Sequence, residues 1–490
     1  MTPRSGAALA SGAVLALMVI WLVATPRQAT AQTPEQAPGR APAPAGAIED
    51  GTQREIPPAP PASVFVPAGH WSLDAARRLH GMGLIPGYDP LLEAQYAHEL
   101  AAAFARAAAS GTGPGRALAA GYHARFLEEW GPVVVADGDV AAMARVEVGA
   151  RRLTGRLLAG RGLPGADDWL GPVQAEDMAG PWVGGAGYLR ANRVAVAGRW
   201  STDERGAPTP VAYGLVGLGP VGVWGGFRNG GLGAGPAAGL VLTRLAPRPG
   251  AGVQLMRPVT LPWVFRHLGP VRFSTAFYRM DRNGDFRNPW LWETRGTIEP
   301  HPRLQLGVSR GIMFGGEGNY EATLQRVAYM LVGKHSGWFD DQIIAVTAQY
   351  RVPVDVPLVT YLRWGFEDSA GAVRDVPGVV LGVESPAVPG LPALALGLVR
   401  TSIARSCCGN PIWYRNHAFR GGWADDGEAL AHPLGGHGVE WLTWGRLDLL
   451  ESRLQLDGTA FYRDRGEENL YAPAREGGSV GGSLRATLLG

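Results

Sequence analysis

A two-residue alternation of apolar and polar side chains recurs along much of this chain and restricts its fold more than any other feature. The segments 271–278, 304–309 and 358–367 all alternate in this way. A period of two is typical of a β-strand with one apolar and one polar face. Each segment is also about as long as a tilted strand that crosses a bilayer. The pattern therefore predicts an all-β protein built from bilayer-length strands.

Beyond the N-terminal region, no uncharged apolar run of the sequence suits a membrane-spanning helix. The stretch 211–227 is rich in glycine, and the stretch 385–399 contains three prolines. Both residue types break helices. A membrane-spanning form must therefore be a β-barrel, because only helices and closed barrels satisfy the backbone in lipid. The 71 Gly, 16 Trp and 13 Tyr residues suit turns and aromatic girdles, and a soluble all-β protein is the alternative.

Short and long links alternate between the predicted strands, as in outer-membrane barrels, where periplasmic turns are short and outer loops are long. Short links are expected at 300–303, 353–357, 385–392 and 450–453. Long links are expected at 281–289, 315–341, 367–375, 402–438 and 464–478. With upstream strands at 188–200, 211–217, 221–228 and 237–244, we predict a large antiparallel transmembrane β-barrel of about 16 to 18 strands. The alternation places the C-terminus and the segment ahead of the barrel on the same, periplasmic side.

The chain divides into four predicted regions. Residues 1–31 are expected to be a secretory signal peptide, since Arg4 precedes an apolar stretch and Ala29 and Ala31 form a small-residue cleavage site; a retained membrane anchor is the alternative. Residues 32–66 form a linker rich in proline and alanine, with too few bulky apolar residues to fold. A helical periplasmic segment is expected over 67–135, and the barrel over 136–490.

Three amphipathic helices are predicted in the segment 67–135. Ser72 caps the first helix, and Gly83 ends it. The second helix is expected over 91–109, and the third helix follows it. The residues that recur at intervals of four along these two helices are Leu92, Tyr96, Leu100 and Phe104, followed by Leu118, Tyr122, Phe126 and Trp130. We expect these stripes to pack against each other or against a barrel mouth.

Several motifs carry a resemblance to a known family. They are WGGFRN at 224–229, GLVLTR at 239–244, LGPVRF at 268–273, PRLQLGVSRGIMFGGEG at 302–318, GFED at 365–368 and HPLGG at 432–436. Through them, the stretch from Gly222 onward resembles the capsule-assembly Wzi family of outer-membrane barrels. The resemblance implies periplasmic helices ahead of a large barrel. It also implies a lectin-like role in holding capsular polysaccharide at the cell surface, with no known catalysis.

The segment 67–104 is similar to one S-layer-homology repeat. The similarity lies in the order Gly69-His-Trp, Asp74-Ala-Ala, Leu79 and Gly83-Leu-Ile-Pro-Gly87, with a helix after it. It implies a tether to a cell-wall polymer such as peptidoglycan. The alternative is a periplasmic plug or spacer with the same helical geometry.

The long link 402–438 carries the mixture of side chains that suits a sugar site. Aromatic faces cover the apolar side of a pyranose, while amides, carboxylates and guanidinium groups bind its hydroxyls or uronate groups. The predicted glycan-binding residues here are Trp413, Tyr414, Arg415, Asn416, His417, Trp423, Asp425 and Asp426. The alternative is an aromatic girdle at the membrane rim with the loop folded into the lumen.

A second polar cluster, in the outer loop 281–289, is expected to extend the glycan surface. Its members are Asp281, Arg282, Asn283, Asp285 and Arg287, of which Asp281, Arg282 and Asp285 are the predicted glycan-binding residues. The alternative is a solvated turn, because Asn283-Gly284 is a hairpin signal.

The remaining motifs indicate no chemistry. Residues 307–311 match G-x-S-x-G around Ser309, but no helix follows, as a nucleophile elbow requires. Cys407 and Cys408 are adjacent, so a bond between them closes almost no chain. The histidines of the link 402–438 are too irregularly spaced to predict a metal site. A net charge of +2 indicates no nucleic-acid footprint.

We therefore predict a non-enzymatic outer-membrane barrel that anchors or helps to assemble capsular or extracellular polysaccharide, with no cofactor. Its expected partners are that polysaccharide, outer-membrane lipid, peptidoglycan through the helical segment, and polysaccharide-export machinery. A diffusion porin is one alternative, and requires an open lumen lined by charges. An outer-membrane hydrolase is another, and requires a serine, a histidine and an acid brought together in space.

Overall fold

The structure is a computed structural model of the 490-residue chain, and it describes residues 62–488 with internal gaps. The residues outside the description are 1–61, 68, 93, 111–112, 135–139, 153–178, 202–210, 233–238, 244, 322, 332–338, 368–376, 404–412, 415, 417–418, 427, 431, 451, 468, 471–476 and 489–490. The predicted signal peptide, most of the predicted linker, Cys407 and Cys408 therefore lie outside the described residues.

Two compact units make up the chain. The larger contains Pro60–Ala322 and Ser336–Gly490, and the smaller contains Met1–Ala59 and Thr323–His335. In the smaller unit the structure describes one helix, α5 (Leu324–Leu331). All other described elements belong to the larger unit.

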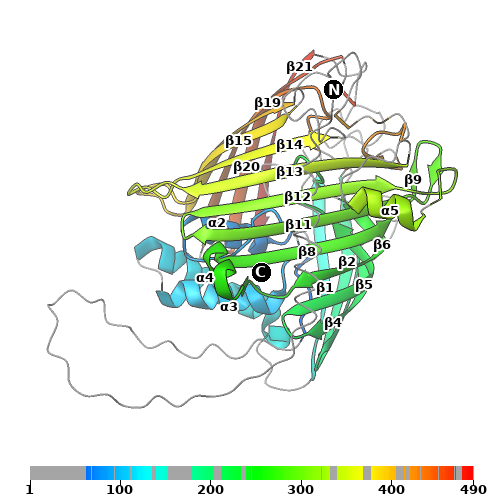
Figure 1. The fold of residues 1–490 in the computed structure, drawn as a ribbon. Coiled ribbons are helices and arrows are strands. Elements are labelled where there is room, and N and C mark those ends of the chain that lie inside the picture. Colours follow the sequence, from blue (N-terminus) through cyan, green and yellow to red (C-terminus); the bar gives the residue numbers. More distant parts are fainter. Residues whose placement is uncertain are drawn as a thin grey trace. The chain divides into compact units, whose positions relative to one another are not determined.

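A single antiparallel sheet dominates the larger unit, and its strands lie side by side in chain order (Figure 1). Of its 17 members, β7 (Val259–Thr260) has only two residues, and the other 16 are long. They are β1 (Val140–Arg152), β2 (Ala179–Ala191), β3 (Val194–Ser201), β4 (Val211–Leu218), β5 (Val221–Gly230), β6 (Leu245–Leu255), β8 (Pro270–Arg279), β11 (Trp290–His301), β12 (Leu304–Phe314), β13 (Asp340–Arg351), β14 (Val359–Glu367), β15 (Gly378–Ser385), β16 (Leu394–Ile403), β19 (Gly438–Leu449), β20 (Leu454–Arg465) and β21 (Gly477–Leu488). The predicted number of 16 to 18 strands is confirmed. Two predicted upstream strands were wrong in their bounds: the segment 188–200 spans the turn between β2 and β3, and residues 239–243 form no strand, since β6 begins at Leu245.

The links between the strands alternate in length as predicted. Short turns join β4 to β5 at Gly219 and Pro220, and β11 to β12 after His301, while the long links leave the opposite end of the strands. Two small hairpins form within long links: β9 (Arg282–Asn283) with β10 (Phe286–Arg287), and β17 (Ala424–Asp425) with β18 (Glu428–Ala429). The residues 217–222, which match G-x-G-x-x-G, form the β4–β5 hairpin.

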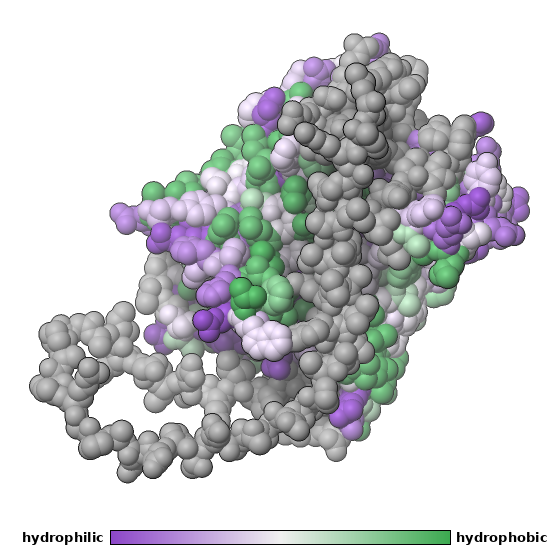
Figure 2. Space-filling view, in the orientation of Figure 1, coloured by the Kyte–Doolittle hydropathy of each residue, from purple (hydrophilic) through white to green (hydrophobic). Residues whose placement is uncertain are grey.

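Side chains on the two faces of the sheet differ as the alternation predicts. On β21, Val480 and Leu484 are exposed on the outer face. On β14, Trp364 points outward, whereas Arg363 and Glu367 are buried on the inner face. In Figure 2, apolar residues gather over the strands, and hydrophilic residues cover the protruding links. An outer face of this kind suits contact with lipid.

Three helices precede the sheet: α2 (Trp71–Gly81), α3 (Ala97–Ser110) and α4 (Gly113–Val134). Their core is aromatic, and its fully or almost fully buried members are Trp71, Phe104, Tyr122, Phe126 and Trp130. The Phe126 and Trp130 rings stack with their centroids 5.9 Å apart. None of the described helices is both long and apolar enough to cross a membrane.

The second predicted helix begins six residues later than expected. The Asp89 carboxylate accepts a hydrogen bond from the Leu91 amide at 3.1 Å, and the Gln95 side chain donates to the Leu92 carbonyl at 2.9 Å. These side-chain bonds compete with helical ones, so the segment 91–96 forms turns instead. The predicted helix start at 91 was therefore wrong, and α3 starts at Ala97.

The last residues of the predicted linker are also folded. Val64, Phe65 and Val66 are buried, and Phe65 forms an antiparallel bridge with Tyr96. Their apolar side chains gain enough burial to order this stretch. Residues 62–66, which were predicted to belong to the linker, are therefore part of the folded chain.

Buried ion pairs attach the helical segment to the inner face of the sheet. Each pair joins a carboxylate of the segment to an arginine of a strand. Asp89 accepts a hydrogen bond from Arg295 of β11 at 2.8 Å. Glu99 accepts one from Arg272 of β8 at 3.0 Å, and Asp74 accepts one from Arg446 of β19 at 2.6 Å. Further contacts come from Arg78, which binds Asp448 of β19, and from Arg125, which donates to the Ser452 carbonyl in a short link. The segment therefore lies at the short-link end of the sheet (Figure 1).

The C-terminal end of β21 lies at this same end. Leu488 pairs with Leu454, directly after the short link between β19 and β20. The expectation that the helical segment and the C-terminus share one side is confirmed. A 3₁₀ helix here, η1 (Trp263–Leu268), exposes Trp263, Val264 and Phe265, and such a group suits a membrane interface.

We expect Asp89→Asn to destabilise the protein by about 3 to 5 kcal/mol, because Arg295 is then left buried without its charged partner. Thermal unfolding in detergent measures the change. The matched control is Glu128→Gln, which removes the exposed pair between the helical segment and Arg453 and costs less than about 1 kcal/mol. Equal unfolding temperatures for the two variants would contradict this attachment.

Candidate functional site

The long link between β16 and β19 is anchored on the inner face of the sheet by its aromatic residues. Trp413, Tyr414 and Trp423 are all almost fully buried. The Tyr414 hydroxyl donates to the Leu240 carbonyl at 2.7 Å, and the Trp423 indole donates to the Val241 carbonyl at 2.7 Å. These two hydrogen bonds connect the β16–β19 link with the long link between β5 and β6.

Glycines on the strands make room for the two tryptophan rings. A Cβ atom at Gly311 of β12 would lie 2.9 Å from the Trp423 ring, and one at Gly378 of β15 would lie 2.7 Å from the Trp413 ring. Real Cβ contacts are longer, so any larger residue at either position displaces the ring. The aromatic side chains of this link therefore act as packing anchors, as in the alternative of a loop folded into the lumen.

The structure brings the two predicted polar clusters together. Asn283 of β9 is buried, and its amide donates to the Gly422 and Ala424 carbonyls at 2.7 Å each. The Asp425 carboxylate accepts from the Asp281 amide at 2.9 Å and from the Arg282 amide at 3.2 Å. The loop 281–288 and the described residues of the loop 413–426 are therefore held together by hydrogen bonds at the long-link end.

Arg248 of β6 completes this junction. Its guanidinium donates to Asp425 at 2.6 Å and lies 3.0 Å from the Asp281 carboxylate. Burial raises the pKa of the Asp425 carboxyl above its ordinary value, although Arg248 and the two backbone amides oppose the change. Sequence reasoning missed Arg248, because it lies on a strand more than 170 positions from Asp425 and carries no local signal of a loop contact.

The junction leaves a rim of charged side chains exposed to solvent. We define this rim as Asp281, Arg282, Asp285, Arg287, Glu317, Arg420 and Asp426, all of which are exposed. Glu317 belongs to the long link between β12 and β13, and its backbone pairs with that of Arg287. Of the residues predicted to bind glycan, Asp281, Arg282, Asp285 and Asp426 lie on the rim. Asn416 is nearly buried and accepts from the Phe419 amide.

Two predicted site residues, Arg415 and His417, lie outside the described residues. His432 is described and buried behind the loop, where its ring lies 3.2 Å from the Thr401 hydroxyl. Burial lowers the pKa of His432 to about 4, so its ring is neutral near pH 7. Within the described ranges, no three His, Cys, Asp or Glu side chains gather as metal ligands would.

Ser309 has no catalytic surroundings. It is buried on β12, and its hydroxyl accepts a hydrogen bond from Arg295 at 2.6 Å. This arginine is paired with Asp89 and cannot serve as a general base.

A serine, a histidine and an acid do meet in the helical segment. His70 lies 2.8 Å from the Ser72 hydroxyl and 2.9 Å from the Glu129 carboxylate. However, Ser72 is fully buried, and the His70 ring also accepts from the Ser72 amide as the cap of α2. The trio therefore caps a helix and leaves its serine no access to substrate.

Comparison with known proteins identifies the family. The model of the capsule assembly protein Wzi family matches residues 178–485, well over half of the chain. The chain belongs to the Wzi family. This confirms the resemblance that the motifs carry. Among curated proteins, no relative matches the chain.

Solved structures show the fold of this Wzi-family chain. The Escherichia coli protein Wzi is described as an outer-membrane protein involved in group 1 capsule assembly and as a carbohydrate-binding β-barrel. It is 17% identical, with a TM-score of 0.64, and the match covers 86% of this chain and 91% of that one. The antiparallel sheet is therefore the wall of an outer-membrane type of β-barrel, as predicted, and its inner face lines the lumen.

A weaker likeness extends to porin structures. Pseudomonas aeruginosa OccK5 (OpdH) is 11% identical, with a TM-score of 0.41, over 71% of this chain and 86% of that one. A Rh. blastica porin mutant is also 11% identical, with a TM-score of 0.37, over 70% of this chain and 100% of that one.

We expect Asn283→Ala to release the loop 413–426, because it removes the buried amide that joins the two loops, at a cost of about 1 to 3 kcal/mol. Hydrogen exchange followed by mass spectrometry should show faster exchange over residues 419–426. The matched control is Asn319→Ala in the neighbouring long link, which should leave these amides protected. Unchanged protection in Asn283→Ala would show that the junction does not depend on this residue.

Proposed function

We propose that this Wzi-family chain is a non-enzymatic outer-membrane barrel that holds capsular or extracellular polysaccharide in a lectin-like way through its outer loops. The observation that carries the proposal is the exposed rim, in which two polar clusters predicted separately form one surface. The description of Escherichia coli Wzi as a carbohydrate-binding barrel supports it. In this proposal the long links face outward and the short links face the periplasm.

The rim has the chemistry that a glycan requires. The carboxylates of Asp281, Asp285 and Asp426 accept hydrogen bonds from sugar hydroxyls, and the guanidinium of Arg282 pairs with uronate groups. Each such contact is weak in water. A polysaccharide repeats its units, so many weak contacts act together and hold the chain at the surface.

The aromatic residues have a different role in this proposal. Trp413, Tyr414 and Trp423 hold the loop against the barrel, and their burial leaves the polar residues to contact the glycan. Arg415 and His417 remain proposed members of the glycan surface, and Asn416 and Asp425 support its backbone.

The helical segment is proposed to be the periplasmic plug of the barrel. Its ion pairs with the inner arginines support this role. We further propose outer-membrane lipid as the partner of the outer face. Peptidoglycan and the polysaccharide-export machinery are proposed as partners of the periplasmic end, where η1 and the helix surfaces are exposed.

A diffusion porin fits these observations less well. A porin needs an open lumen, whereas here the helices occupy the short-link end and the aromatic anchors of the long link occupy the other end. A hydrolase needs an accessible nucleophile, and both Ser309 and Ser72 are buried.

The combined variant Asp281→Asn, Arg282→Gln and Asp426→Asn should reduce the polysaccharide retained by cells about tenfold or more, since it removes three charged contacts of roughly 0.5 to 1.5 kcal/mol each. Cell-associated polysaccharide is measured after washing, at matched protein levels.

The control is Glu128→Gln with Arg453→Gln, which changes exposed charges at the opposite end and should leave retention unchanged. Normal retention by the rim variant would remove this surface from the glycan site.

A further inference from the structure

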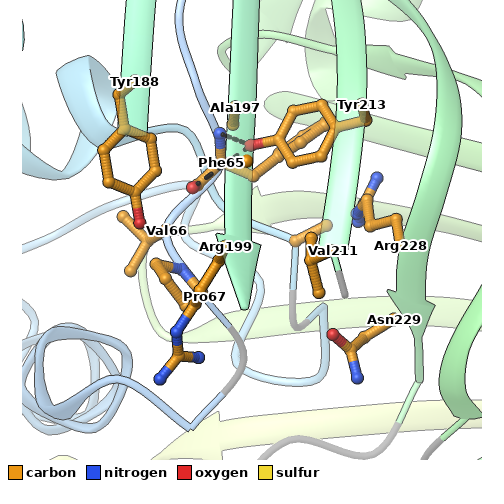
Figure 3. A pocket seen from close by; sticks show the side chains of 12 residues that line it. Phe65, Val66, Pro67, Tyr188, Ala197, Arg199, Val211, Tyr213, Arg228 and Asn229 are labelled. Atoms are coloured by element: carbon orange, nitrogen blue, oxygen red, sulfur yellow. Dashed lines mark hydrogen bonds between the residues drawn. The ribbon is translucent and has the colours of Figure 1, made fainter. Parts of the chain in front are cut away.

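A small cavity lies on the inner side of the barrel wall, between the strands β2 to β5 and the segment ahead of α2 (Figure 3). The space open to the centre of a water molecule is about 50 Å³. Phe65, Val66 and Pro67 form one side, and Tyr188, Tyr213 and Arg228 are among the residues on the other. Pro67, Arg199 and Asn229 keep part of their surface exposed, so the cavity is not sealed.

Arg228 of β5 is the unusual member of this cavity. Its guanidinium carbon lies 3.9 Å from the centre of the Phe65 ring and 4.5 Å from that of Trp224. The residue is only 8% exposed. These two rings hold the guanidinium in place, but their faces do not satisfy its five N–H donors.

Within the described part of the chain, no carboxylate pairs with Arg228, in contrast to Arg272, Arg295 and Arg446. The lining of the cavity contains no acidic residue. A buried cation without a partner costs several kcal/mol. An anion in the cavity offsets this cost.

We propose that this cavity binds a carboxylate group, with Arg228 as its principal ligand. The cavity has room for only a few water molecules, so it can hold a carboxylate group but not a whole pyranose ring. A planar carboxylate matches the two parallel N–H bonds of a guanidinium. The side chains of Asn229 and Arg199 also line the cavity (Figure 3).

A uronic-acid residue is the source of carboxylate that this proposal favours. Arg199, Val211 and Arg228 of the lining lie toward the long-link ends of β3, β4 and β5, the side that holds polysaccharide in the function proposed above, and the helical segment closes the cavity from the other side. The choice of a sugar rests on that function. A free small carboxylate has the same chemistry, and the test separates the two sources.

The test is calorimetric titration of the full mature chain in detergent, at low ionic strength, with glucuronate, acetate and glucose. We expect glucuronate to bind and glucose not to bind. Arg228→Met should weaken glucuronate binding at least tenfold, and Arg228→Lys should weaken it less, because it keeps the charge but loses the paired donors. The matched control is Arg279→Met, which removes an arginine stacked on Trp290 away from the cavity and should bind like the unaltered chain.

Each outcome of the titration either supports or overturns the carboxylate site. Acetate binding as tight as that of glucuronate, and lost in Arg228→Met, supports the carboxylate site with a free anion as its occupant. Absence of glucuronate binding, or equal binding by Arg228→Met, overturns the proposal. If Arg228→Met does not fold, bromide-soaked crystals of the unaltered chain replace it: an anomalous peak beside Arg228 supports the site, and its absence overturns it. The retention assay on the rim variant is independent, so failure of the proposed function is recognised separately.

Discussion

Charged side chains on the inner face of the barrel require partners, and this requirement determines how the lumen is filled. Arg272, Arg295 and Arg446 project from three different strands, and each is buried. An unpaired buried charge costs several kcal/mol. The helical segment supplies a carboxylate to each of them, from Glu99, Asp89 and Asp74, and Arg446 has a second partner in Asp457 of β20. The strands and the helices therefore stabilise one another, and removal of the segment would leave Arg272 and Arg295 buried without a carboxylate partner.

A different interaction fills the long-link end of the barrel. Tyr414 and Trp423 bond to backbone carbonyls of another loop, and Asn283 and Asp425 join that body to the hairpin β9–β10. This packing holds the long links in one fixed arrangement, and the charged side chains of the rim remain exposed to water. Preformed charged surfaces lose little entropy on binding. A fixed rim therefore suits repeated weak contacts with a polymer better than flexible loops do.

Local patterns of the sequence predicted much of the fold, because strand alternation and helix stripes depend on neighbouring residues. The segment 271–278 became β8, and the stripe through Tyr122 and Trp130 became α4. Contacts between distant residues left no such pattern. The turn at Asp89 competes with a predicted helix, and Arg248 reaches Asp425 from another strand. The burial of Trp413 depends on Gly378, and neither residue indicates this contact by itself.

The central claim is that apolar outer faces of paired strands place this chain in the outer membrane, with its lumen filled by its own segments. Extraction of isolated cell envelopes with urea tests it most directly. A barrel whose backbone bonds close within lipid should remain with the outer-membrane pellet and require detergent for release. Recovery of the full-length chain in the soluble fraction, without detergent, would contradict the account.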